Sequence, residues 1–287
     1  MSNETIPSVL YKYLAPCRAS QILRDLRIRF SQVTVLNDAD EFQPLYKDFA
    51  TREETERISR ELLPSKYPNE IAAIHRQFLP DEAEKWIAEM VSNCADNLEA
   101  NFEKIVKDLY AKLDSKFGML SLSATMTSKL MWSFYCDGGR GVVIEFDPSH
   151  AWFNCKTANN DSFHHLRRVQ YVEDREPTHF LSAKEDEVLY TKTREWKFEE
   201  EWRIIRNFKE ANGKAGQDLY GKDVFLFEIP PLAIQAVIFG YRTTSEDETA
   251  LLEIVRANVN LKHIVFRRAV RNVDGKIEIV PDVTGIL

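Results

Sequence analysis

A chain of 287 residues with 44% hydrophobic and 29% charged residues has the composition of an ordinary globular protein, which excludes a disordered chain. Its net charge of −7 disfavours a bulk electrostatic attraction to nucleic acid. No apolar run approaches the ~18 residues of a membrane span, and the N-terminus lacks a secretory signal, so we expect a cytoplasmic protein without membrane contact. The 4 cysteines form no C-x-x-C pair and therefore predict neither a zinc site nor a disulfide framework.

The first apolar segment, VLYKY at residues 9–13, predicts a strand in which Lys12 is flanked by Tyr11 and Tyr13. A short helix and a second strand at residues 28–32 are expected to follow. Asn37 and Asp38 then predict a turn, because both side chains hydrogen-bond to their own backbone. The acidic residues of this turn, Asp38, Asp40 and Glu41, are interpreted either as a site for a ligand or a metal or as a solvated turn.

Residues 45–117 differ from the strand-rich remainder of the chain, because apolar residues recur there at spacings of three and four. This pattern predicts an all-helical insertion within a single α+β domain of residues 1–287. Pro64, Pro68 and Pro80 are expected to divide the insertion into two or three helices. Its apolar stripe is interpreted as core packing or, alternatively, as a partner-binding face.

Residues 120–147 combine serine, aromatic and glycine residues more densely than any other segment. Ser121 and Ser123 alternate with leucines, so a strand there places both hydroxyls on one face. Thr125, Thr127 and Ser128 are candidate caps of a short helix with Trp132 and Tyr135. The glycines that follow predict a turn into a second apolar strand.

Two later segments carry charge. Residues 164–168 contain two histidines and two arginines, which we interpret either as a solvated face or as a phosphate contact. Residues 182–193 are expected to be helical. A strand is then predicted to begin near Glu201, with Glu201 and Arg203 on one face and Trp202 on the other. Glu201 is therefore a candidate for stabilising a developing cation, or for an ion pair with an arginine.

Seven segments, in order, resemble an uncharacterised bacterial family classed as domain of unknown function 2971. They are VLYKY, LND-x-x-E at residues 36–41, LSLS, MWSFY, GGRGVVIEFD, EEEWRII and IPPLAIQAVIFG. The resemblance covers nearly the whole chain apart from the helical block. No activity is established for that family, so the resemblance implies kinship rather than function.

The order of elements also resembles the ADP-ribosyltransferase fold. There a first strand bears a basic or histidine residue, a middle strand bears serine or threonine with an aromatic, and a later strand opens with a catalytic glutamate. This resemblance implies an α+β domain with a bent or split, antiparallel-rich mixed sheet, NAD as substrate and no metal. It implies catalytic roles for Lys12, Tyr135 and Glu201. The residues implied in nucleotide binding are Tyr11, Tyr13, Asn37, Ser121, Ser123, Trp132 and Arg203.

Lys12 departs from that fold's usual arginine or histidine, and the run Glu199, Glu200, Glu201 leaves the register of the glutamate open. We carry three hypotheses. The first is an NAD-using ADP-ribosyltransferase-like enzyme, as a bacterial toxin or phage-defence effector, with a protein or nucleic acid as acceptor. The second is a non-catalytic nucleotide- or nucleic-acid-binding module that uses residues 164–168. The third is a protein-interaction domain built on the helical insertion.

Overall fold

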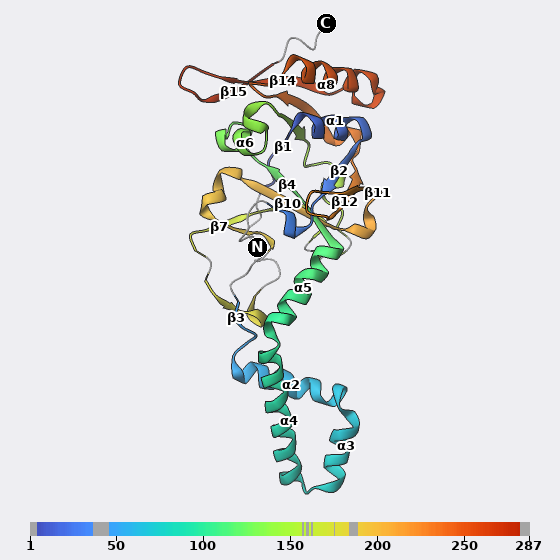
Figure 1. Cartoon of the computed structure of the whole chain (residues 1–287), viewed down its shortest axis with the longest axis vertical. Helices are drawn as coiled ribbons and strands as arrows, with labels where there is room; N and C mark the ends of the chain where they lie inside the picture. Colours follow the sequence, from blue (N-terminus) through green and yellow to red (C-terminus); the bar gives the residue numbers. More distant parts are fainter. Residues whose placement is uncertain are drawn as a thin grey trace. The chain divides into compact units, whose positions relative to one another are not determined.

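The computed structural model describes residues 5–36, 46–156, 158, 161, 163–174, 176–183 and 189–281 (Figure 1). The chain divides into two compact units. The first, the sheet unit, comprises Met1–Asp38, Asp114–Asp174 and Tyr190–Leu287. The second, the helical unit, comprises Ala39–Leu113 and Arg175–Leu189. The expected α+β class with a mostly antiparallel sheet is confirmed.

The main sheet has eight strands within the described residues, and all neighbouring pairs are antiparallel except β13 with β14. In order across the sheet the strands are β15 (Ile277–Pro281), β14 (Val265–Arg271), β13 (Ile234–Phe239), β5 (Val142–Phe146), β1 (Leu10–Leu14), β4 (Phe117–Ser123), β10 (Glu201–Asn207) and β6 (Arg167–Arg168). The strands that carry the conspicuous motifs, β1, β4 and β10, are therefore adjacent.

A second sheet contains β11 (Gly213–Gln217), β12 (Asp223–Glu228) and β2 (Arg27–Phe30). The bridge between Ser31 and Met119 connects the end of β2 with β4. A short parallel pair, β7 (Gln170–Val172) and β9 (Thr191–Thr193), lies elsewhere in the sheet unit. The helix expected over residues 182–193 is thus wrong at its C-terminal end, where Thr191–Thr193 is extended.

Both faces of the main sheet are covered. The helices α1 (Pro16–Asp25) and α8 (Ser245–Ala257) lie side by side (Figure 1) and bury Leu23 and Leu251 in a core that includes Ile144. On the other face, α6 (Lys129–Phe134) buries Trp132 in a core that includes Val143. Because β5 is covered on both sides, its sequence is a continuous apolar run rather than an alternating one.

The glycine-rich segment between α6 and β5 forms a tight turn that few side chains would permit. Ser128, one of the three candidate caps, caps α6 by accepting a hydrogen bond from the backbone of Met131. Gly139 has a φ of 86°, in the region that favours glycine. A Cβ atom at Gly141 would lie 2.2 Å from the carbonyl oxygen of Leu14. These glycines allow β5 to pair closely with β1.

The helical unit contains a small core made by Leu63, Ile87 and Val91. Pro68 and Pro80 occupy the first turns of helices, as expected, whereas Pro64 lies inside α2 and does not end it. The elements of the helical unit are β3 (Tyr46–Asp48), α2 (Arg52–Lys66), α3 (Pro68–Gln77), α4 (Pro80–Ala100), α5 (Phe102–Lys116) and β8 (Thr178–His179). The last residues of α5 already belong to the sheet unit, and β4 follows directly.

Candidate functional site

Glu201 and the two serines of β4 lie on one face of the main sheet. In the antiparallel register, Glu201 is opposite Ser123 and Arg203 is opposite Ser121. On its other side, Ser123 is opposite Tyr11 of β1. Directly opposed residues of neighbouring strands share a face, so the alternation predicted for β10 is confirmed.

Lys12 occupies the place where β1 separates from β4. The two strands pair at a single position, Tyr11 opposite Ser123, and Met119 then pairs with Ser31 instead. The ammonium group of Lys12 donates a hydrogen bond of 2.9 Å to the backbone carbonyl of Ser121. The Lys12 side chain thereby supplies a donor to the Ser121 carbonyl, which lies between the two paired positions of β4, Ser123 and Met119. Without it, this carbonyl would lack a hydrogen bond on that side.

Four buried charged side chains form the centre of the site. The Lys192 ammonium lies 2.7 Å from an oxygen of Glu199 and 2.9 Å from an oxygen of Glu201. Arg203 binds Glu201 with two hydrogen bonds, of 2.7 Å from Nε and 2.8 Å from Nη2. Glu201 is 3% exposed and Arg203 is fully buried. We call these four residues the charge cluster.

Neutral groups fix the two carboxylates of the cluster. The Tyr135 hydroxyl donates to Oε1 of Glu199, and the Ser123 hydroxyl donates to the Glu199 carbonyl at 2.6 Å. The Ser121 hydroxyl lies near the Glu201 carboxylate and acts to lower its pKa. Tyr135, Ser121 and Lys12 are each partly exposed, in contrast to the four residues of the charge cluster.

Lys192 is a site residue that no sequence pattern indicated. It lies on β9, where Tyr171 of β7 is its register partner, and the Tyr171 hydroxyl accepts a hydrogen bond of 2.9 Å from the backbone of Glu201. The short strand Thr191–Thr193 therefore delivers the lysine to both carboxylates. A strand of three residues has no measurable periodicity, so only the proximity of TKT to the glutamate run hinted at this role.

Burial changes the proton affinity of the site residues. It lowers the pKa of Lys12 to about 8, although the Glu201 and Glu199 carboxylates act in the opposite direction. It raises the pKa of Glu201, an effect that Lys192 opposes and Glu199 reinforces. Burial by itself lowers the pKa of Lys192, but Glu201 and Glu199 together raise it above its ordinary value. The cluster therefore holds Lys192 charged.

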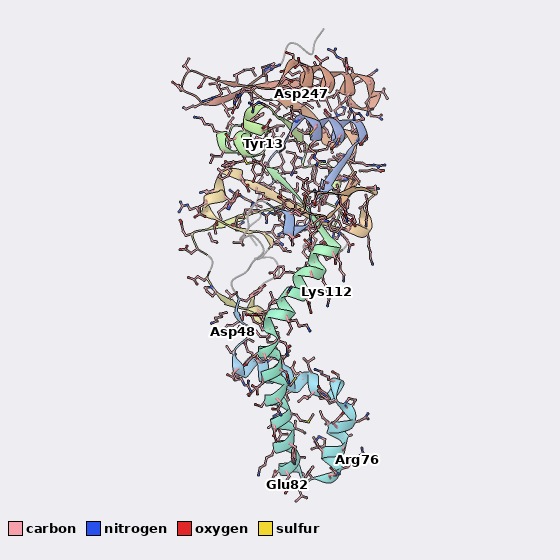
Figure 2. The ribbon with its side chains drawn as sticks, in the orientation of Figure 1. Tyr13, Asp48, Arg76, Glu82, Lys112 and Asp247 are labelled. Carbon is pink, nitrogen blue, oxygen red and sulfur yellow. The ribbon has the colours of Figure 1, made fainter. Side chains whose placement is uncertain are left out.

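Three other predicted site residues are buried in the core between α6 and the main sheet, the core that includes Val143. Trp132 is fully buried and donates from its indole nitrogen to the Met126 carbonyl at 2.9 Å. Tyr13 (Figure 2) lies edge-on to Trp132 and donates to the Thr125 carbonyl at 2.8 Å. Tyr11 is buried in the same core. Asn37 lies outside the described residues.

Residues 164–168 do not form an unpaired basic surface. The two ring nitrogens of His164 lie 2.8 Å from Asp161 and 2.9 Å from Glu210. The Arg167 guanidinium lies over the Tyr190 ring, 4.1 Å from its centroid. Burial lowers the pKa of His164, but the two carboxylates raise it above its ordinary value. Part of the positive charge that suggested a phosphate contact is thus already matched.

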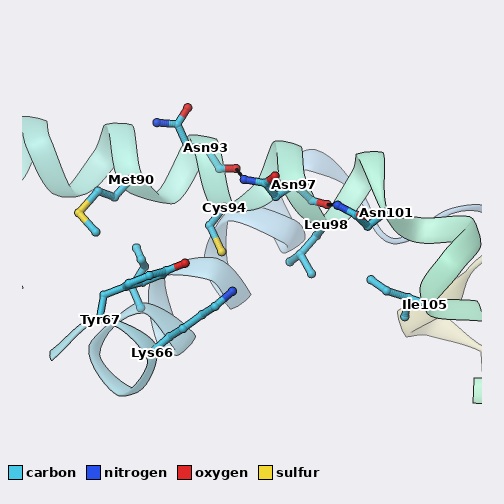
Figure 3. Close-up of a pocket in the computed structure, with 10 residues that line it drawn as sticks. Lys66, Tyr67, Met90, Asn93, Cys94, Asn97, Leu98, Asn101 and Ile105 are labelled. Atoms are coloured by element: carbon cyan, nitrogen blue, oxygen red, sulfur yellow. Dashed lines mark hydrogen bonds between the residues drawn. The ribbon is translucent and has the colours of Figure 1, made fainter. Parts of the chain in front are cut away.

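The helical unit has a cavity of its own, of about 550 Å³, between α4 and the end of α2 (Figure 3). Tyr67 and Lys66 lie across from Cys94. Asn97 and Asn101 use their amide groups on backbone carbonyls of α4, so these donors are occupied within the helix. Its lining combines apolar side chains with neutral amides and one lysine.

The described part of the chain holds no group of three or more histidine, cysteine or acidic side chains that is arranged to bind a metal ion. No helix in the same residues is long and apolar enough to cross a membrane.

The fold and site define an α+β protein with a buried charge cluster at β10, one strand from the edge of the main sheet. Residues 131–204, from α6 into β10, match the model of a family described as "Protein of unknown function (DUF2971)". The expected resemblance is thereby confirmed over these residues, which contain MWSFY, GGRGVVIEFD and most of EEEWRII, whereas the other four motifs lie outside the match. No curated protein and no solved structure matches the chain.

Proposed function

We propose that the protein is an ADP-ribosyltransferase-like enzyme that cleaves NAD and transfers ADP-ribose to a protein or nucleic-acid acceptor. One observation carries the proposal. Lys12, Ser121 and Glu201 come from three adjacent strands. The backbone carbonyl of Ser121 accepts the hydrogen bond of Lys12, and its hydroxyl lies near the Glu201 carboxylate. The three residues that carry the resemblance to the ADP-ribosyltransferase fold are therefore neighbours on the sheet, which supports the proposal.

The chemistry needs a negative charge beside the ribose. When the bond between nicotinamide and the ribose carbon breaks, its electron pair leaves with nicotinamide and the sugar acquires oxocarbenium character, as in glycoside hydrolysis. Glu201 and Glu199 supply carboxylates for that charge. The acceptor then forms a bond to the same carbon, and its proton passes to a carboxylate or to water.

A ligand reaches these carboxylates from the partly exposed edge. Lys12, Ser121 and Tyr135 line that edge, and Lys192 changes partners there when a ribose hydroxyl replaces one of its carboxylate contacts. Because Trp132 is buried, the exposed aromatic rings beside the cluster are better candidates for stacking on nicotinamide. Phe134 is 65% exposed, and its ring lies 6.0 Å from that of Phe198, which in turn lies 6.0 Å from Trp196.

The test is release of nicotinamide from NAD by the purified protein, with and without cell lysate as a source of acceptor. We expect Glu201→Gln to lower the rate about 100-fold, because one electrostatic contact to the transition state is worth about 3 kcal/mol. Glu145→Gln is the matched control, since Glu145 is also buried in an ion pair. Its partner is Arg267, at 2.6 Å, which is not part of the charge cluster. Equal rates of nicotinamide release in both variants, or no release by the wild type, would contradict the proposed enzymatic activity.

A second candidate is a non-catalytic nucleotide-binding module. It is favoured by the charge compensation of Glu201, which is contacted by Arg203 and Lys192 and is almost inaccessible to solvent. In this case NAD raises the Tm of the wild type and of Glu201→Gln by the same amount, and neither protein releases nicotinamide. Binding without turnover thus separates the two candidates.

A further inference from the structure

A separate cavity of about 670 Å³ lies on the other side of β10, within the sheet unit. Arg206 lines it, and this residue points to the face opposite that of Glu201 and Arg203 because side chains alternate along a strand. The volume falls in the range of about 300–1,000 Å³ that small-molecule sites occupy. Neither the charge cluster nor the proposed NAD chemistry uses this cavity.

Arg206 is buried but incompletely satisfied. Its Nη2 atom donates to the Trp152 carbonyl and, at 3.3 Å, to the Cys155 sulfur. The guanidinium also lies 4.4 Å from the centroid of the Trp152 ring. Its Nε atom is buried and has no hydrogen-bond partner among the described residues. Only 7% of the residue is exposed, and burial lowers the pKa of this guanidinium below its ordinary value.

Arg27, the first residue of β2, brings a second guanidinium to the same cavity. Its Nε atom is likewise buried without a hydrogen-bond partner in the described part of the chain. The nearest carboxylate contact is long, since Nη2 lies 4.0 Å from Glu228. Two arginines therefore line one cavity, and within the described residues neither guanidinium has a carboxylate oxygen closer than 4.0 Å.

The acidic side chains around the cavity are already engaged or lie at its exposed rim. Glu210 binds His164 at 2.9 Å and accepts from the backbone of Asn207 at 3.2 Å. Asp25 and Glu228 are exposed. A ligand with one anionic group satisfies the arginines, whereas a polyanion is repelled by the two rim carboxylates.

We propose that this cavity binds a small molecule bearing one oxyanion, a carboxylate or a phosphate, which Arg206 and Arg27 hold together. Guanidinium groups match both oxyanions in planar, paired hydrogen bonds. Trp152 supplies an apolar wall beside the anion. The site is independent of NAD cleavage, because it lies on the opposite face of β10.

The test titrates the full-length protein with inorganic phosphate and with acetate at constant ionic strength, and follows the Tm. A specific anion raises the Tm in a saturable manner, by about 3 °C when it reaches about ten times its Kd. The anion that produces the saturable rise identifies the source, phosphate or carboxylate. Arg27→Gln is expected to weaken the apparent affinity about tenfold, as loss of one charge-assisted contact does.

The control is Arg29→Gln, which removes the same charge two residues along β2. Arg29 pairs with Asp218 at 2.6 Å and does not line the cavity, so its variant should keep the wild-type Kd. Arg206→Met should abolish the shift, and if that variant does not fold, the comparison of Arg27→Gln with Arg29→Gln still decides. An unsaturable Tm change, or equal affinity in both variants, overturns the proposal. Nicotinamide release should be unchanged in Arg27→Gln, which separates this site from the proposed activity.

Discussion

At the scale of single residues, Lys12 illustrates how one side chain serves both the sheet and the candidate site. Its ammonium group completes the hydrogen bonding of the Ser121 carbonyl where β1 leaves β4. The same group lies within electrostatic reach of Glu201 and Glu199. The catalytic role that the resemblance implies for Lys12 therefore competes with a contact that the sheet already uses.

We predict that Lys12 makes folding stability depend on pH. Burial lowers its pKa from 10.5 in the unfolded chain to about 8 in the folded protein. Between these values the unfolded chain binds the additional proton, so the free energy of unfolding rises as pH increases from about 8 to about 10.5. The stabilising contribution is complete above 10.5 and is lost as pH falls through 8.

The measurement is urea unfolding of the wild type and of Lys12→Met across this pH range. The difference between the two free energies of unfolding cancels the other groups that titrate there. We expect the difference to grow with pH in favour of the wild type, because only its stability gains the Lys12 term. A pH-independent difference would show that the ammonium is as well solvated in the folded chain as in the unfolded one.

At the scale of elements, β9 shows how a very short strand determines a site. It pairs with β7, places Lys192 opposite Tyr171, and so brings one ammonium group to two carboxylates. Charges with so little solvent access are tolerated only when they are paired. The position of β9 and the charge state of Glu199 and Glu201 are therefore coupled.

Lys192→Met is predicted to destabilise the protein by about 3–5 kcal/mol at neutral pH, because it leaves two carboxylates buried near each other. The penalty should shrink as pH falls and Glu201, whose pKa is raised by burial, binds a proton. Adding Glu199→Gln to this variant should restore part of the loss. Lys214→Met is the control: Lys214 pairs with Asp223 at 2.7 Å but is 58% exposed, so about 0–1 kcal/mol is expected. Equal losses in urea unfolding would refute the role given to Lys192.

The sequence predicted the elements whose signals are local. The strand of Lys12, the cap at Ser128 and the start of β10 at Glu201 follow from alternation, capping preference and β-branched composition. Lys192 could not be found this way, because its role depends on a parallel pairing between distant short strands. The contact of Lys12 with the Ser121 carbonyl is equally non-local. It depends on where β4 leaves β1, and there Met119 of β4 pairs with Ser31 instead.

At the scale of the whole molecule, the chain has separate cores in its two compact units. The sheet unit buries Leu120 at 1% exposure, and the helical unit buries Leu63 at 2%. The helical unit is interrupted in sequence, because residues 175–189 belong to it as well as residues 39–113. Whether the units unfold together is a question of how stability is divided between the two cores.

We predict that the two units open independently. Leu63→Ala and Leu120→Ala each remove a fully buried leucine side chain, at a cost of about 2–5 kcal/mol. Hydrogen exchange measured by mass spectrometry should then show faster exchange in α2 and α4 for Leu63→Ala, with β4 and β10 unchanged, and the reverse for Leu120→Ala. The two variants serve as each other's control because the substitution is identical. Faster exchange throughout the chain in both variants would mean that a single cooperative transition joins the units, and the helical unit would then be part of the same folding domain as the sheet.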